Sequence, residues 1–247
     1  MTEETALNCQ LAVVSKIKYK GTEIVVLEDV YEPAEDTFLL ADCAVSEVSK
    51  LLPTSEDISS QNNKENEKDS GDFSVFEVGS GSGFVSAFLQ DNFPSIRLTA
   101  VDINPNAVSC AQMNGVQAFE ADMFDLFNEL ISESKSKSEL ESENQSLTFD
   151  LILFNPPYLP TAEDEKVDGP LNYAFDGGIS GRDSIDRFLE EVGDYLKETG
   201  FFLLLISSIT GLDETIEEME INGFSAEVIG KTKCSFEELI VLKGKRL

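Results

Sequence analysis

The chain has 247 residues, 41% of them hydrophobic, and its 47 acidic against 18 basic residues give a formal net charge of −29. This length suits one α/β domain (residues 1–247), no apolar run is long enough to span a membrane, and the polar start MTEETALNCQ is unlike a signal peptide, so we expect a soluble cytoplasmic protein. The absence of His excludes Ser-His-Asp and Cys-His nucleophiles, and four scattered Cys without a CxxC pair argue against a metal site, so no metal is expected.

The N-terminal part of the chain predicts a hairpin followed by a helix. Residues 17–30 indicate two short strands around Lys20-Gly21-Thr22, and the three- and four-residue spacing of apolar positions from Phe38 to Leu52 predicts a helix after Pro33. We regard residues 10–52 or so as an N-terminal extension of the domain. Residues 53–72 and 132–146 are almost without apolar side chains, and we interpret them as hydrophilic insertions at the surface rather than as binding tails.

The rest of the chain alternates strands with helices. Strands are expected at residues 75–78, 98–101, 117–120, 149–154, 201–206, 226–229 and 237–242, and helices at 84–90, 105–113, 184–197 and 214–221. Such alternation predicts an α/β, Rossmann-like fold, with a mostly parallel seven-stranded sheet, helices on both faces and an antiparallel C-terminal strand. In such sheets a ligand binds at the carboxyl ends of the strands.

A glycine-rich turn and two acidic positions suggest a nucleoside site at those ends. The turn EVGSGSG (residues 77–83) follows the first core strand, and its glycines allow the backbone to approach a ligand closely. Its GxGxG spacing differs from the dinucleotide motif. Asp102 ends the next strand, where a carboxylate accepts ribose hydroxyls. Asp122 could accept an adenine amino group and Met123 cover the ring, although a loop or helix-cap role explains Asp122 equally well.

The sequence Asn155-Pro156-Pro157-Tyr158 at the end of an apolar strand is the most specific element. Two prolines remove two N–H donors and fix the backbone. The Asn155 side-chain oxygen and the Pro156 carbonyl can then accept both N–H groups of a planar NH2, while Tyr158 lies against its flat face. This arrangement predicts alignment of a nitrogen for in-line attack on a methyl donor, with no strong base, no metal and no covalent intermediate. A proline-bracketed turn without function is the alternative.

The order EVGSGSG, VDINPNA, AD and NPPY resembles the class I methyltransferases that act on nitrogen. VYEPAEDTFLL upstream and AFDGGISGRD downstream narrow the resemblance to the HemK-like glutamine methyltransferases, in the short archaeal and eukaryotic branch that modifies the GGQ loop of translation termination factors. The resemblance covers residues 30–242 apart from the two insertions. It implies S-adenosylmethionine as cofactor and methylation of the glutamine side-chain amide.

The resemblance also implies roles for individual residues. The cofactor is expected to contact Thr37, Glu77, Gly79, Gly81, Asp102, Ile103, Asp122, Met123 and Asn155. The catalytic residues are expected to be Asn155, Pro156 and Tyr158, and the substrate is expected to contact Asn155, Pro156, Pro157 and Tyr158. Glu32 and Glu35 match a stretch near the cofactor, or else serve the start of a helix, and Asp176-Gly177-Gly178 would form a loop beside the cleft. Short members of this family commonly pair along an edge strand with a small zinc-binding activator protein, for which residues 116–119 are the candidate edge.

Two other functions compete with glutamine methylation. An exocyclic amine of adenine or guanine in nucleic acid is as planar as an amide, but a net charge of −29 disfavours phosphate contact unless Lys16, Lys18 and Lys20 converge beside the cleft with the lysines near the C-terminus. A catalytically silent binding subunit is disfavoured because nothing in a scaffold requires the NPPY residues and Asp102 together. The acidity is also compatible with adaptation to a salty cytoplasm.

Overall fold

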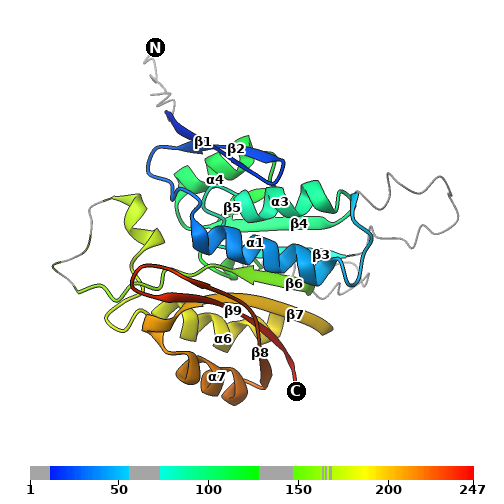
Figure 1. The fold of residues 1–247 in the computed structure, drawn as a ribbon, viewed down its shortest axis with the longest axis vertical. Helices are drawn as coiled ribbons and strands as arrows, with labels where there is room; N and C mark the ends of the chain where they lie inside the picture. The colour runs from blue at the N-terminus through cyan, green and yellow to red at the C-terminus, as the bar shows by residue number, and fades with distance from the viewer. Residues whose placement is uncertain (1–11, 56–72, 128–146, 163, 165, 167–168) are drawn as a thin grey trace, which may run out of the picture.

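The computed structural model describes residues 12–55, 73–127, 147–162, 164, 166 and 169–247. Its seven-stranded sheet has the order β5-β4-β3-β6-β7-β9-β8 (Figure 1). All neighbouring pairs up to β7 are parallel, and β9 is antiparallel to both β7 and β8. The strands are β3 (Ser74–Val78), β4 (Arg97–Asp102), β5 (Ala118–Glu120), β6 (Phe149–Phe154), β7 (Leu196–Ser207), β8 (Phe224–Lys233) and β9 (Glu238–Arg246). The predicted α/β fold is confirmed.

Helices cover both faces of the sheet because the central strands are apolar on both sides. Along β6, Leu151 and Leu153 join the core cluster that contains α1 (Glu35–Val48), α3 (Phe84–Asn92) and α4 (Pro105–Met113). Ile152 and Phe154 join the cluster on the other face, with α6 (Asp183–Tyr195) and α7 (Leu212–Ile221). Alternate side chains of this continuous apolar run therefore pack into two separate cores, one on each face of the sheet.

The N-terminal hairpin consists of β1 (Val13–Tyr19) and β2 (Thr22–Leu27), so the first strand begins earlier than predicted and the second ends earlier. Its turn residues Lys20 and Gly21 both have positive φ, as a two-residue hairpin turn requires. Asn114, at the end of α4, holds the hairpin to the domain: its Oδ1 accepts from Val25 N–H at 2.9 Å, and its Nδ2 donates to the carbonyls of Val25 and Ser82 at 2.8 and 2.9 Å. The hairpin is therefore tied to the glycine-rich turn.

Several further predicted boundaries were wrong. The helix expected over residues 184–197 ends at Tyr195, because Leu196 already pairs with Phe149 as the first residue of β7. α1 ends at Val48 rather than Leu52, and the C-terminal strands are longer than predicted. Strand pairing in the sheet overrode the local helical pattern at the end of α6 and extended the C-terminal strands. α1 ends in a turn instead, where the N–H groups of Leu51 and Leu52 donate to the Val48 carbonyl.

The two predicted hydrophilic insertions lie outside the described residues, except for residues 53–55 of the first. Within the described part of the chain, no helix combines the length and the apolar character needed to cross a bilayer.

Candidate active site

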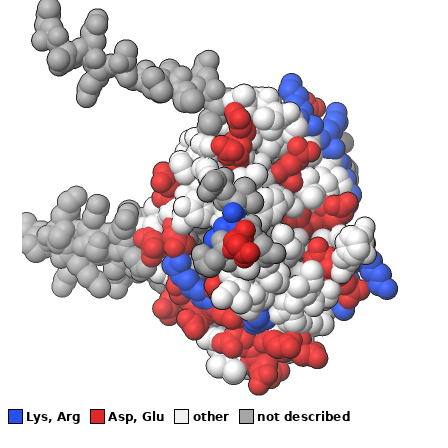
Figure 2. Space-filling model, turned by 90° about the vertical axis from the view of Figure 1, so that its left-hand side faces the viewer, with Lys and Arg blue, Asp and Glu red and all other residues white. Residues whose placement is uncertain are grey.

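A cavity of about 450 Å³ lies at the carboxyl ends of β3, β4 and β6. The residues predicted to contact the cofactor or the substrate all line it: Thr37, Glu77, Gly79, Gly81, Asp102, Ile103, Asp122, Met123, Asn155, Pro156, Pro157 and Tyr158. Figure 2 views the molecule from this side, which is the left-hand side of Figure 1, where the β8–β9 turn lies. The structure thus brings together segments that lie up to 121 residues apart, from Thr37 to Tyr158.

The glycine-rich turn forms one wall of the cavity. Gly79, Gly81 and Gly83 all have positive φ, between 52° and 78°, which L side chains rarely adopt. At Gly83 a Cβ would lie only 2.9 Å from Ala111 of α4, so this glycine also allows close helix packing. The Ser80 hydroxyl lines the cavity, is buried and has no hydrogen-bond partner among the described residues. The turn therefore offers a backbone surface and a free hydroxyl to a ligand.

Two buried carboxylates lie beside this turn. Burial raises the pKa of Glu77 from its ordinary 4.5 to about 8, against the lowering effect of its hydrogen bond from Ser86, and the nearby Asp102 charge raises it further. Burial also raises the pKa of Asp102. Asp102 accepts from the N–H of Gly81 and of Asn104, both at 2.8 Å. Each of its oxygens keeps a further lone pair, so Asp102 can still accept from a hydroxyl of a ligand.

Asp122 and Met123 complete this end of the cavity. Met123 has a φ of 48°, is buried and lines the cavity. Asp122 accepts from Arg187 of α6 at 2.6 Å, and Arg187 also pairs with Glu191. Asp122 and Glu191 raise the pKa of Arg187, so the guanidinium stays charged and holds one oxygen of Asp122. Sequence reasoning missed Arg187, because no motif links α6 to the end of β5.

The segment before α6, which contains the AFDGGISGRD motif (residues 174–183), packs against the end of the NPPY segment (residues 155–158). Leu159 N–H donates to the Phe175 carbonyl at 3.2 Å and Gly177 N–H donates back to the Leu159 carbonyl at 3.1 Å. A Cβ on Gly181 would lie 2.5 Å from the Tyr158 carbonyl, so only glycine permits this approach. Asp176 lines the cavity, as expected for the predicted loop, whereas Gly177 and Gly178 are not among the lining residues. The AFDGGISGRD motif therefore shapes the cleft through backbone contacts.

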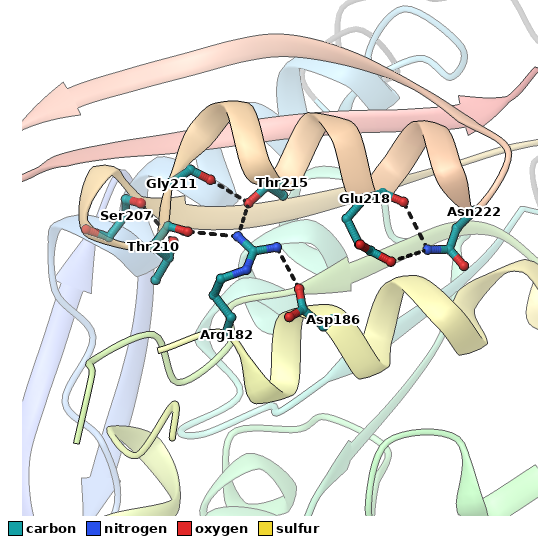
Figure 3. A network of polar contacts seen from close by, with 8 residues as sticks. All are labelled: Arg182, Asp186, Ser207, Thr210, Gly211, Thr215, Glu218 and Asn222. Carbon is teal, nitrogen blue, oxygen red and sulfur yellow. Dashed lines mark hydrogen bonds and ion pairs between the residues drawn. The ribbon is translucent and has the colours of Figure 1, made fainter. Parts of the chain in front are cut away.

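Arg182, near the end of that motif, connects the loop before α6 to the start of α7 (Figure 3). Its guanidinium donates to the Thr210 carbonyl and the Thr215 hydroxyl at 2.8 and 2.9 Å, and it pairs with Asp186 at 2.6 Å. The Ser207 hydroxyl, in the same network, bonds to Glu237, which lines the cavity. Arg182 thus has a structural role that connects the start of α6, the start of α7 and the cavity wall.

Among the acidic residues just before and at the start of α1, the one that lines the cavity is not one of those predicted to lie near the cofactor. Glu32 and Glu35 are exposed and do not line the cavity, so the helix-start role fits Glu35, which lies in the first turn of α1. Asp36 lines the cavity instead: it is buried, and its Oδ2 accepts from Asn155 Nδ2 at 3.0 Å and from the Tyr31 hydroxyl at 3.1 Å. The sequence could have identified Asp36 only as the buried position of the EDT triplet.

Comparisons with known proteins agree with this site. Residues 64–168 match the methyltransferase small domain family. A Methanocaldococcus jannaschii protein with the name "putative protein N5-glutamine methyltransferase" is 37% identical, over 94% of this chain and 99% of its own length. The chain belongs to the HemK-like glutamine methyltransferase family. Human methyltransferase HEMK2 is 33% identical over 87% of this chain and 89% of its own length.

As a member of this family the chain is an S-adenosylmethionine-dependent N-methyltransferase. The catalytic subunit mtq2 of the Schizosaccharomyces pombe eRF1 methyltransferase is 28% identical over 89% of the chain and 90% of its own length. Solved structures agree on the fold: the E. cuniculi Mtq2–Trm112 complex matches with a TM-score of 0.58 at 23% identity, over 89% of this chain and 99% of that chain. A T. thermophilus 16S rRNA methyltransferase bound to AdoMet and guanosine matches with a TM-score of 0.54 at 11% identity, over 94% of this chain and 45% of that one.

Proposed function

We propose that this enzyme methylates the side-chain amide nitrogen of the glutamine in the GGQ motif of a translation termination factor, in the cytoplasm. The observation that carries the proposal is the Asn155 side-chain oxygen, which is buried, has no partner among the described residues and belongs to a residue that lines the cavity. A buried acceptor left unpaired is costly unless a ligand donates to it. A primary amide supplies the required N–H donor.

The residues of the cavity fit S-adenosylmethionine. When bound, this cofactor supplies an electrophilic methyl group on a positively charged sulfur. Glu77 and Asp102, both at most 9% exposed, place two carboxyl groups beside the glycine turn, where a cationic ligand compensates for their burial. Asp102 would hold the ribose, Asp122 and Met123 the adenine, and Thr37, Gly79, Gly81 and Ile103 the remaining contacts. The unpartnered Ser80 hydroxyl adds a donor for a carboxylate.

Asn155, Pro156 and Tyr158 would hold the substrate amide. Asn155 Oδ1 and the Pro156 carbonyl accept its two N–H groups, which orients the nitrogen and increases its electron density. Burial, and then the charge of Asp36, raise the pKa of Tyr158, so its ring packs against the amide as a neutral phenol and does not act as a base. After methyl transfer the positively charged N-methyl amide loses one proton to water, so this step does not require a His, which the chain lacks.

The charge distribution argues against nucleic acid as the substrate. Lys18 lies near Glu23 of the same hairpin, and Lys20 at its turn pairs with Asp42 of α1. Lys231 pairs with Glu238 at 3.2 Å, and Lys243 is paired with the buried Glu47. Acidic side chains are spread over the cavity side of the molecule and gather at its lower end (Figure 2). These lysines do not form the basic surface that a phosphate backbone requires.

A small partner protein would bind at the β5 edge of the sheet. β5 and β8 are the two edge strands of the sheet, and β5 is only three residues long. Phe119 within β5 and Met113 at the end of α4 are 39% and 60% exposed. The E. cuniculi relative forms a complex with Trm112. We propose that a small zinc-binding activator pairs along residues 116–119 and covers these side chains.

The test is transfer of labelled methyl from S-adenosylmethionine to a GGQ-containing termination factor, with and without a candidate activator. A GGA variant of the factor and an adenine-containing duplex serve as controls. Label on the GGQ factor alone would support the proposal, and comparison of the two conditions would show the activator dependence. Label on the duplex alone would contradict it. Substitution of Phe119 by Asp should abolish co-purification with the activator and leave cofactor binding intact.

A further inference from the structure

Asp36 has both carboxylate oxygens committed, and this determines what Asn155 can do. Its Oδ1 accepts from the backbone N–H of Thr37 at 2.6 Å and from the Thr37 hydroxyl at 3.2 Å. Its Oδ2 accepts from the Tyr31 hydroxyl at 3.1 Å and from Asn155 Nδ2 at 3.0 Å. Asp36 is only 4% exposed, so water does not compete for these oxygens. Asn155 is 119 residues away, at the end of β6.

The contact with Asp36 fixes the orientation of the Asn155 amide. A side-chain amide has a donor end and an acceptor end of nearly equal shape, so packing alone does not choose between its two orientations. An ionised carboxylate only accepts hydrogen bonds. Only the orientation with Nδ2 towards Asp36 is favourable, because the inverted amide would place its oxygen against a carboxylate oxygen in a site of low dielectric. Asn155 Oδ1 then faces away from Asp36, where it has no partner among the described residues.

We infer that Asp36 is a positioning residue which sets the hydrogen-bond polarity of the acceptor site. By holding the donor end of Asn155, it makes the site present an acceptor, and so it selects substrate groups that donate N–H, such as a primary amide, over carboxylates and ester carbonyls, which only accept. The inference rests on the proposed function in one respect: it takes Asn155 to contact the substrate. Asp36 itself acts through Asn155 and need not touch the substrate.

The variant D36N tests the inference with little change in shape. The Thr37 N–H is a fixed donor, so the oxygen of the new side chain stays with Thr37 and its NH2 group faces Asn155. Asn155 must then turn its oxygen to that NH2 group and present a donor to the substrate amide. We expect kcat for GGQ methylation to fall about 100-fold, the loss typical of removing one aligned hydrogen bond in an active site, with cofactor Kd changed less than about twofold. D42N is the matched control on the same helix, since Asp42 bonds to Tyr19 and Lys20.

The double variant D36N/N155D separates polarity from structure. In it the new amide at position 36 donates to the new carboxylate at position 155, whose second oxygen faces the substrate as an acceptor. We expect kcat to recover at least about tenfold relative to D36N, a non-additivity that a double-mutant cycle measures. A merely structural role predicts activity at or below that of the weaker single variant, and this result would overturn the inference.

A readout independent of methyl transfer keeps this test apart from the test of the function. In the ¹⁵N-labelled protein the side-chain NH2 signal of Asn155 is identified by its loss in N155D. We expect D36N to shift that signal and D42N to leave it in place; an unmoved signal in D36N would overturn the inference, whatever the substrate. Absence of label on GGQ in the wild type would instead contradict the proposed function. Thermal unfolding of each variant shows whether the fold is retained. If D36N does not fold, kcat of D36N/N155D is compared with that of N155D: a higher kcat supports the inference, and a kcat no higher than that of N155D overturns it.

Discussion

The two halves of the cavity are built in different ways. The half that would bind the methyl donor is called the donor half and consists of the turn 79–83 with Glu77, Asp102, Asp122 and Met123. It comes from the ends of β3, β4 and β5, which are neighbours in both sequence and sheet. The half that would hold the methyl acceptor, the substrate amide, is called the acceptor half and consists of residues 155–158 with Asp36, Asp176 and Glu237. It comes from segments spread over 202 positions, from Asp36 to Glu237. The donor half therefore depends on local turns, and the acceptor half depends on contacts that only the complete fold supplies.

This difference predicts separable defects. The donor half presents backbone groups and carboxylates, so changes there should alter cofactor affinity and its pH dependence. The acceptor half presents one oriented amide and two proline-fixed carbonyls, so changes there should alter turnover at unchanged cofactor affinity.

The largest effect is expected for Asn155→Ala, which removes the substrate acceptor. Transfer to the GGQ factor should fall by about 1,000-fold, the upper range for loss of one oriented group at a reacting centre. Cofactor Kd, measured by calorimetry, should change less than about threefold. Asn222→Ala, at the C-cap of α7 and not among the residues that line the cavity, is the control and should leave turnover unchanged. A loss of cofactor affinity in Asn155→Ala as large as the loss of turnover would contradict the functional separation of the two halves.

Arg182→Ala tests whether the acceptor half depends on remote anchoring. Its side chain is 15% exposed and holds three partners, so its removal should lower the free energy of unfolding by about 3 kcal/mol, as expected when a mostly buried charge partner is lost. Denaturant unfolding measures this loss. Arg182→Lys should recover only part of it, because an ammonium lacks the planar fork of donors. Full stability of Arg182→Ala would show that the network in Figure 3 contributes little.

The raised pKa of Glu77 predicts that the stability of the folded protein depends on pH through a residue of the donor half. Its pKa in the folded protein is about 8 against an ordinary 4.5, so between these values the folded state holds a proton that the unfolded state has lost. The cofactor-free protein should therefore lose stability as pH rises through this window, by about 2 kcal/mol from about pH 6 to about pH 8. Glu77→Gln should remove this component, seen as the difference between two denaturation series. Parallel pH profiles for wild type and variant would contradict the shift.

The smallest effect is expected for Asp102→Asn. Loss of the ribose acceptor should weaken cofactor binding by about tenfold, or about 1.4 kcal/mol, and transfer at saturating cofactor should change little. Asp150→Asn is the matched control: Asp150 also accepts from a backbone N–H, that of Ser74 at 2.7 Å, but at the opposite end of the sheet. It should alter stability only. Normal cofactor affinity in Asp102→Asn would contradict the assigned ribose role.

Much of the donor half could be predicted because its signals are local. Glycines at 79, 81 and 83 are required by the positive φ of the turn, and Asn104 caps α4 by accepting from Asn106 N–H, as its position before Pro105 indicated. The predicted cavity residues all line one cavity for the same reason: parallel strands bring their carboxyl ends to one edge. Errors arose at Glu32 and Glu35, where sequence alone did not show which acid of the YEPAEDT stretch is buried.

The sequence by itself determined the order of strands and helices, the apolar runs that become two-faced strands, and the chemistry available at each strand end. Apolar periodicity and turn residues act over a few neighbours, so these features can be read without the fold. Only the tertiary structure decided that Asp36 meets Asn155, that Arg187 holds Asp122 and that Arg182 ties α6 to α7. Hydrogen-bond partners are chosen by distance in space, and the chain leaves that distance open until the sheet assembles.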